Sequence, residues 1–226
     1  MQEVNLIIAA MDEEVIALVE NLGEYEIVEI DNYKTYKFNV NDEIYYLIQG
    51  QIGKVNTAIV LSRLALLLNI KRVFNIGTSG GIDKSLNIND VIVATKVGYH
   101  DVDVTNFGYK VGQIPGEERY YHCDIEFIDK KLSSSKYSIR KGIILSGDSF
   151  ITRENINSTN LINEECLCCE MESATVGQVC TKLNIPFVII RSISDLTFKQ
   201  FDFDSNDTNV HSSSTNSALV LLELLK

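Results

Sequence analysis

The stretch IPFVIIRSISD, residues 185–195, contains an apolar run that we expect to form a buried strand over residues 187–190. Asp195 lies just past its end, and Glu172 lies at the start of the helical pattern that precedes it, over residues 171–183. Ligands of open α/β sheets bind beyond the carboxyl ends of the strands. We therefore expect Glu172 and Asp195 to converge on a binding crevice, unless they serve only as acids at helix N-termini.

Strand and helix patterns alternate along the whole chain and predict an α/β fold, a three-layer α/β/α sandwich with a central mixed sheet. Expected strands cover residues 4–10, 33–40, 43–48, 71–76, 90–97, 138–145, 166–169 and 187–190. Expected helices cover residues 12–22, 53–69, 171–183 and 213–225, the second with Val55, Ile59, Leu66 and Leu67 facing inward. The 226 residues include no linker-like run, so we expect one domain over residues 1–226.

Composition argues against several classes of protein. The net charge is −11, from 20 Lys and Arg against 31 Asp and Glu, and an acidic surface repels nucleic acid. Residues 2–10 run directly into Asp12, Glu13 and Glu14, unlike a signal peptide, and no apolar run approaches the roughly 20 residues of a membrane helix. We expect a soluble, cytoplasmic protein that binds neither nucleic acid nor membranes.

The cysteines and histidines show no metal-ligand spacing. An odd number of cysteines, with three of them within residues 166–169, does not suit a disulfide framework, and Cys-x-Cys-Cys is not a zinc spacing. We expect the cysteines of residues 166–169 to form a buried strand with Leu167, packing as small apolar side chains, and we expect no metal site. The cysteines are Cys123, Cys166, Cys168, Cys169 and Cys180.

Three further segments could carry chemistry. The run GTSGG at residues 77–81 follows a strand and is either a plain turn or a ligand-binding loop, since it lacks the lysine and spacing of a P-loop. Glu14 is the third acid of a helix start, so it either complements the helix dipole or points into the crevice. Residues 99–119 have little regular pattern, and loops of this length are usually functional.

A sheltered carboxyl at Asp195 could act as an acid near neutral pH, and Glu172 could bind a pair of sugar hydroxyls.

Eight motifs in order along most of the chain resemble those of the bacterial 5′-methylthioadenosine/S-adenosylhomocysteine nucleosidases, within the nucleoside phosphorylase-like family. They are AMDEEV (10–15), GQIGKV (50–55), NIGTSGG (75–81), YHDVDVTNFGY (99–109), GQIPG (112–116), SGDSFI (146–151), EME (170–172) and RSISD (191–195). The resemblance implies hydrolysis of the N-glycosidic bond of 5′-thio-substituted adenosines, in methionine salvage, without a cofactor. 5′-Deoxyadenosine is a further expected substrate.

The resemblance also implies roles for individual residues. Glu14 corresponds to the base that activates water, and Asp195, oriented by Ser194, corresponds to the acid that protonates adenine N7. Glu172 and Met171 match the ribose site, and Phe150 and Ile151 the adenine site. Further expected substrate-binding residues are Met11, Ile52, Thr78, Ser79, Gly80, Glu170 and Arg191.

A homodimer follows from the resemblance, because Val104, Phe107 and Pro115 match positions that wall the 5′-pocket of the partner subunit. Phe201 or Phe203 is expected to close over the ligand. The alternatives are a purine nucleoside phosphorylase, a futalosine-type nucleosidase and a non-catalytic nucleoside-binding module. A phosphorylase needs cationic side chains for phosphate, and arginine is the usual choice. Here the first strand–helix junction carries Glu14, and Asn75 stands where phosphorylases commonly have arginine, so hydrolysis is favoured.

Overall fold

The structure is a computed structural model that describes the backbone of residues 2–132, 135–200 and 202–226, and their side chains except those at 162, 163, 203 and 204. The strands are β1 (Glu3–Ala9), β2 (Glu26–Ile30), β3 (Tyr33–Val40), β4 (Glu43–Gln49), β5 (Asn69–Gly81), β6 (Val91–Tyr99), β7 (Tyr121–His122), β8 (Ile139–Ser146), β9 (Cys168–Glu170) and β10 (Phe187–Leu196). The helices are α1 (Asp12–Val19), α2 (Lys54–Leu67), α3 (Ile125–Leu132), α4 (Ser173–Leu183) and α5 (Phe203–Leu225), with short 3-10 turns at Thr105–Phe107, Ile156–Ser158 and Asn160–Asn163.

These strands form one mixed sheet, in the order β10-β6-β8-β9-β5-β1-β4-β3-β2, with β7 paired to β6. β1 runs parallel to β4 and β5, whereas β6 runs antiparallel to β10. The predicted α/β fold with a central mixed sheet is confirmed. Because β10 also pairs with β5, the strands β5, β10, β6, β8 and β9 close into a ring, a feature that the sequence patterns did not predict.

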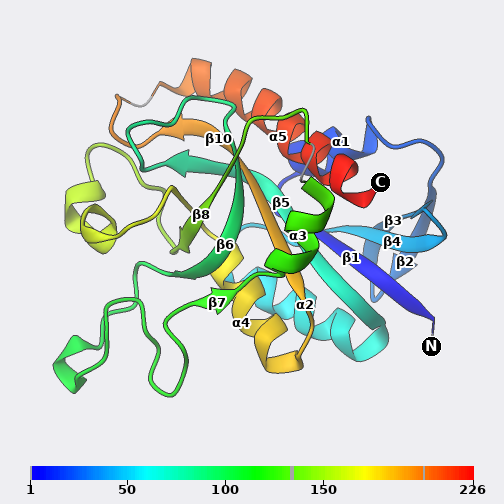
Figure 1. The fold of residues 1–226 in the computed structure, drawn as a ribbon, viewed down its shortest axis with the longest axis horizontal. Coiled ribbons are helices and arrows are strands. Elements are labelled where there is room, and N and C mark those ends of the chain that lie inside the picture. The colour runs from blue at the N-terminus through cyan, green and yellow to red at the C-terminus, as the bar shows by residue number, and fades with distance from the viewer. Residues whose placement is uncertain (1, 133–134, 201) are drawn as a thin grey trace.

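Helices cover both faces of the sheet (Figure 1). α5 packs on β10 and β5 beside α1 and α3, whereas α2 and α4 lie side by side on the opposite face. The core between these layers is built mainly from the aliphatic side chains of β1, β5, β6 and β10. None of the described helices is long and apolar enough to cross a membrane.

Two strands are longer than predicted, and this changes the setting of the acidic residue Asp195. β5 continues through residues 77–81, so GTSGG is strand rather than a turn, and β10 continues to Leu196, so Asp195 lies within a strand and does not cap a helix. Small residues are needed there because a Cβ on Gly77 would lie 2.3 Å from Nη1 of Arg191. A register shift between Ile193 and Asp195 then places Asp195 opposite Gly80.

The prediction for the inward face of α2 was wrong. The helix buries Thr57, Val60, Leu61 and Leu64, while Val55 is 69% and Leu66 83% exposed, and Ile59 and Leu67 are also exposed. Apolar residues occupy both sides of this helix, so periodicity alone does not select the buried side, and packing against α4 does. All five cysteines are buried and free, and the burial predicted for Cys166, Cys168 and Cys169 is confirmed.

Candidate active site

One cavity collects residues from the ends of β1, β5, β9 and β10 and from the loop after β8. Its lining residues are Ala10, Met11, Glu14, Ile52, Thr78, Ser79, Gly80, Ser149, Phe150, Ile151, Cys169, Glu170, Met171, Glu172, Ser194 and Asp195. The predicted residues Glu14, Glu172 and Asp195 are therefore brought together, as the strand-end rule requires. Among the described lining residues, four are carboxylic acids and none is lysine or arginine.

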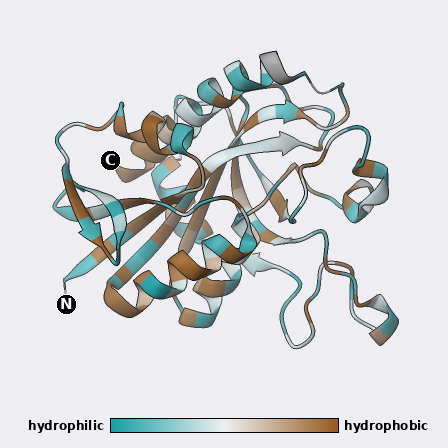
Figure 2. Ribbon diagram, turned by 180° about the vertical axis from the view of Figure 1, so that it is seen from behind, coloured by the Kyte–Doolittle hydropathy of each residue, from teal (hydrophilic) through white to brown (hydrophobic). Residues whose placement is uncertain are grey.

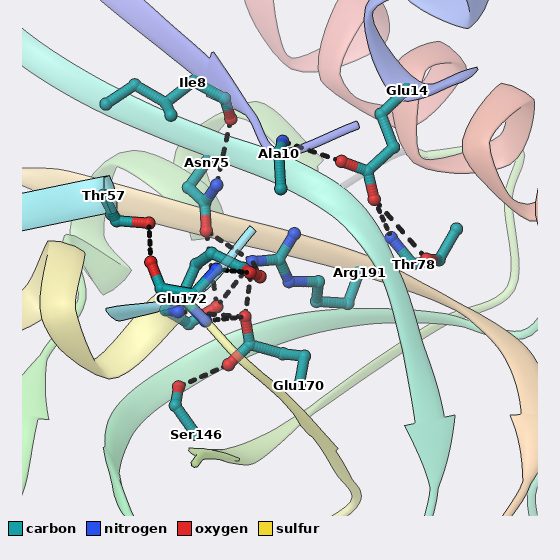
Figure 3. A network of polar contacts seen from close by, with 12 residues as sticks. Ile8, Ala10, Glu14, Thr57, Asn75, Thr78, Ser146, Glu170, Glu172 and Arg191 are labelled. Atoms are coloured by element: carbon teal, nitrogen blue, oxygen red, sulfur yellow. Dashed lines mark hydrogen bonds and ion pairs between the residues drawn. The ribbon is translucent and has the colours of Figure 1, made fainter. Parts of the chain in front are cut away.

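Glu14 is buried at the start of α1, where it bridges two strands. Its Oε2 accepts hydrogen bonds from the backbone N–H groups of Ala10 (2.8 Å) and Met11 (3.1 Å), and its Oε1 accepts one from Thr78 N (2.9 Å). Glu14 therefore caps the N-terminus of its helix and also lines the cavity, and Figure 3 shows its contacts with Ala10 and Thr78. Burial raises the pKa of Glu14, although the charge of Arg191 and the backbone donors oppose this rise.

Asp195 lies at the register shift in β10 and faces the same cavity. The Ser194 hydroxyl donates a hydrogen bond to Oδ1 of Asp195 over 2.9 Å and so orients the carboxyl group. Burial raises the pKa of Asp195 above its ordinary value, with the Ser194 hydrogen bond acting in the other direction. Two carboxyl groups, each with a raised pKa, therefore line one cavity, and carboxyl groups in such a setting can serve as general acid and general base.

Glu170 and Glu172 both lie just before the first residue of α4, and their pKa values are shifted in opposite directions. Oε1 of Glu172 accepts a hydrogen bond from Gly53 N over 2.8 Å, and burial, together with the nearby charge of Glu170, raises its pKa to about 8. Glu170 is also desolvated, but Arg191, Ser146 and the N–H groups at the helix start hold its pKa below the ordinary value. Of these two carboxyl groups, Glu172 therefore has the less stabilised charge, and its side chain does not cap α4.

Arg191 was expected among the substrate-binding residues, but it does not line the cavity. Its guanidinium lies beneath the cavity, 1% exposed, and donates through Nη2 to Asn75 (2.6 Å), Glu170 (2.5 Å) and Ser173 (3.1 Å), as Figure 3 shows for Asn75 and Glu170. Its charge therefore neutralises the buried acids rather than presenting a free cation to a ligand. Asn75 in turn donates to the carbonyl oxygen of Ile8.

Several predicted positions lie away from this cavity in the single chain. Val104, Phe107 and Pro115 belong to the long segment between β6 and β7 and do not line it, and Phe107 is 80% exposed. Of the two candidates for the lid, Phe201 lies outside the described residues, and so does the side chain of Phe203 at the start of α5.

Sequence reasoning missed some residues of the site. Ala10, Ser149 and Cys169 line the cavity. Their only signal in the sequence is adjacency to predicted residues, because small side chains that reach a cavity through the path of the backbone carry no chemical mark of their own. Among the described residues, no group of three or more His, Cys, Asp or Glu side chains is placed to hold a metal ion.

Comparisons with known proteins show the family to which the chain belongs. A model of the phosphorylase superfamily matches residues 6–226. A 5′-methylthioadenosine/S-adenosylhomocysteine nucleosidase from Staphylococcus saprophyticus is 38% identical over 194 residues, covering 84% of this chain and 85% of the relative. The S. pneumoniae nucleosidase with the transition-state inhibitor MT-ImmA has a TM-score of 0.89 and 30% identity, covering 100% of this chain and 99% of that chain. A Helicobacter pylori nucleosidase mutant with 5′-methylthioadenosine in the active site has a TM-score of 0.88 and 27% identity, covering 99% and 98% of the two chains.

The chain therefore belongs to the phosphorylase superfamily and, within it, to the family of 5′-methylthioadenosine/S-adenosylhomocysteine nucleosidases.

Proposed function

We propose that this protein hydrolyses the N-glycosidic bond of 5′-methylthioadenosine and S-adenosylhomocysteine, releasing adenine and the thioribose, and that it also accepts 5′-deoxyadenosine. The activity of its relatives supports the reaction, and the chemistry of the cavity supports the choice of water as nucleophile. A phosphate dianion needs cationic partners, but the described lining offers four carboxylic acids, and Arg191 already pairs with Glu170. This acidic lining is the observation that carries the proposal.

In this mechanism the protons balance across two carboxyl groups. Asp195 donates its proton to adenine N7, so that adenine leaves as a neutral base when the bond between C1′ and N9 breaks. Glu14 takes a proton from water as the water oxygen bonds to C1′. Each turnover leaves Glu14 protonated and Asp195 ionised, and exchange with solvent restores both. General acid and general base assistance each contribute on the order of 10²- to 10⁴-fold.

The other lining residues suit recognition of the rest of a nucleoside. We assign the ribose hydroxyls to Glu172, the sugar face to Met171 and the 5′-thio group to the apolar side chains of Met11 and Ile52. Phe150 would stack on adenine. The backbone of Ile151 would form hydrogen bonds to the edge of the base. The strand segment of Thr78, Ser79 and Gly80 would pack against the base and the sugar.

Adenine release from 5′-methylthioadenosine, followed with and without phosphate, tests the proposal. Phosphate-independent release with free methylthioribose is the expected result. Release only with phosphate, giving a sugar 1-phosphate, would identify a phosphorylase and overturn the role of Glu14.

Hydrolysis of these substrates would place the protein in methionine salvage. We also propose a cytoplasmic location, since buried free thiols suit a reducing compartment.

We further propose a homodimer in which Val104, Phe107 and Pro115 complete the partner's 5′-pocket. The exposed side of α2 supports this proposal, because Val55, Ile59 and Leu66 place apolar surface along the helix, and Figure 2 shows hydrophobic stretches on it. Ile52 continues this surface into the cavity. Light scattering on the purified protein and on Val55→Asp tests the assembly. We expect a dimer that the substitution dissociates, whereas a wild-type monomer would contradict the proposal.

A further inference from the structure

A charged cluster outside the cavity joins three chain segments. Nζ of Lys54, the first residue of α2, lies 2.7 Å from Oδ2 of Asp101 and 3.1 Å from Oδ2 of Asp148. Asp148 N also donates to Oδ2 of Asp101 over 2.9 Å, and the ammonium group lies 5.3 Å from the ring centroid of Tyr99. Asp101 follows β6 and Asp148 follows β8, so one side chain of α2 holds both loops.

The residue before Lys54 is in direct contact with the proposed ribose site. Gly53 donates its backbone N–H to Oε1 of Glu172 over 2.8 Å. Its carbonyl oxygen accepts a hydrogen bond from the Thr57 hydroxyl over 3.0 Å. Gly53 has φ of 98°, a left-handed conformation that strains other residues, and the next backbone N–H, that of Lys54, donates to Oδ1 of Asp148 over 3.5 Å. The orientation of this N–H therefore depends on what holds the neighbouring residues.

We propose that Lys54 is a positioning residue: its contacts with Asp101 and Asp148 hold Gly53 where its N–H orients Glu172 toward the ribose hydroxyls. The inference rests on the proposed function. Both contacts join opposite full charges, and hydrogen bonds between charged groups are stronger than neutral ones. Lys54 and Asp101 are partly buried, whereas Asp148 is exposed. Partial burial disfavours the charge of Lys54, but the hydrogen bonds with Asp101 and Asp148 outweigh it and raise its pKa, so that the lysine stays charged around neutral pH.

Lys54→Met tests this role, because it keeps an unbranched apolar stem beside Tyr99 and removes the ammonium group. We expect kcat/KM for 5′-methylthioadenosine to fall about 10- to 100-fold. This is the effect of losing one hydrogen bond to a charged group, here the bond from Gly53 N to Glu172. Lys54→Arg keeps the charge and should recover most of the loss. Lys141→Met is the matched control, since it removes an ion pair with Asp129 away from the cavity. It should leave kcat/KM within about twofold, as surface pairs contribute little.

Substrate analogues distinguish the proposed positioning role of Lys54 from a merely structural one. With 5′-methylthioadenosine analogues that lack the 2′- or the 3′-hydroxyl, the penalty of Lys54→Met should shrink for the analogue missing the hydroxyl that Glu172 binds. In the same way, Lys54→Met should add little to Glu172→Gln in a double-mutant cycle. Equal penalties on all substrates, or additive effects, would overturn the inference.

A second variant and the activity of the wild-type protein complete the test. If Lys54→Met does not fold, Asp148→Asn probes the same cluster from an exposed side chain, and it should give a smaller loss with the same dependence on the hydroxyls. A wild-type protein that does not hydrolyse 5′-methylthioadenosine would refute the proposed function. A wild-type enzyme that is active, with Lys54→Met behaving like Lys141→Met, would refute only the role of Lys54.

Discussion

Replacing Asp195 with asparagine isolates the proton that adenine is proposed to receive. The amide has nearly the shape of the carboxyl group and can still accept the Ser194 hydroxyl, which lies 2.9 Å from Oδ1. It cannot deliver a carboxyl proton. We therefore expect kcat to fall about 10²- to 10⁴-fold, which corresponds to about 2.7 to 5.4 kcal/mol of lost transition-state stabilisation, while KM changes by only a few-fold.

The pH dependence of stability gives an independent readout for the same variant. Burial raises the pKa of folded Asp195 above its ordinary 3.8, so the folded state holds this proton more tightly than the unfolded chain. Its contribution to stability is complete below 3.8 and is lost as the pH rises through the folded value. Asparagine does not ionise, so Tm of Asp195→Asn relative to the wild type should increase with pH.

The assay is adenine release under saturating substrate, with binding of 5′-methylthioadenosine measured by calorimetry and Tm measured across the pH range. The acid-dependent limb of the wild-type pH profile should disappear in Asp195→Asn. Turnover within a few-fold of wild type would refute the acid role. Loss of binding together with a lower Tm at every pH would instead mean that the carboxyl group holds the site together.

Three further predictions concern the other buried groups. Glu14→Gln should lower kcat by a similar 10²- to 10⁴-fold in the adenine assay while retaining substrate binding, because its amide oxygen can still accept from Thr78 N, although its NH2 group cannot accept from Ala10 N and Met11 N. For Glu172→Gln, whose carboxyl has its pKa raised from 4.5 to about 8, Tm relative to the wild type should increase as the pH rises from 4.5 to 8, because the wild type loses stability over that window. A constant difference in Tm would contradict this. Gly77→Ala should destabilise the fold by about 1–3 kcal/mol in denaturant unfolding, since its Cβ would lie 2.3 Å from Arg191 and 2.4 Å from Glu14, and an unchanged midpoint would mean that these side chains can move aside.

Sequence patterns were most successful where local periodicity and burial agree. The first strand, the hairpin of β3 and β4 and the helix α4 appear close to their predicted bounds. The patterns missed β2, β7 and α3, of which β7 is only two residues long, and they ended β5 and β10 too early. Both strands continue through small or polar residues that have low strand propensity. Their pairing with each other, Arg191 opposite Gly77 and Asp195 opposite Gly80, supplies the stabilisation that propensity lacks.

The sequence indicated which acidic residues line the cavity, but it did not indicate the full geometry of the site. Glu14, Glu172 and Asp195 could be selected because acids at strand ends and helix starts are visible in the order of residues. The burial of Arg191 could not, because its partners Asn75, Glu170 and Ser173 lie on β5, β9 and α4, far apart in the sequence. The same reason hid the link between Lys54 and Asp101, which are 47 residues apart.

The sequence by itself determined the class of fold, the order of its elements and the residue types available for chemistry, because these follow from local periodicity and from motifs that are contiguous in the chain. Tertiary structure alone decided which side of α2 is buried, how β10 closes against β5 and which carboxyl groups have a raised pKa. These outcomes depend on desolvation and on contacts between distant segments. Desolvation and long-range contacts exist only once the chain has packed, so no short stretch of the sequence predicts them.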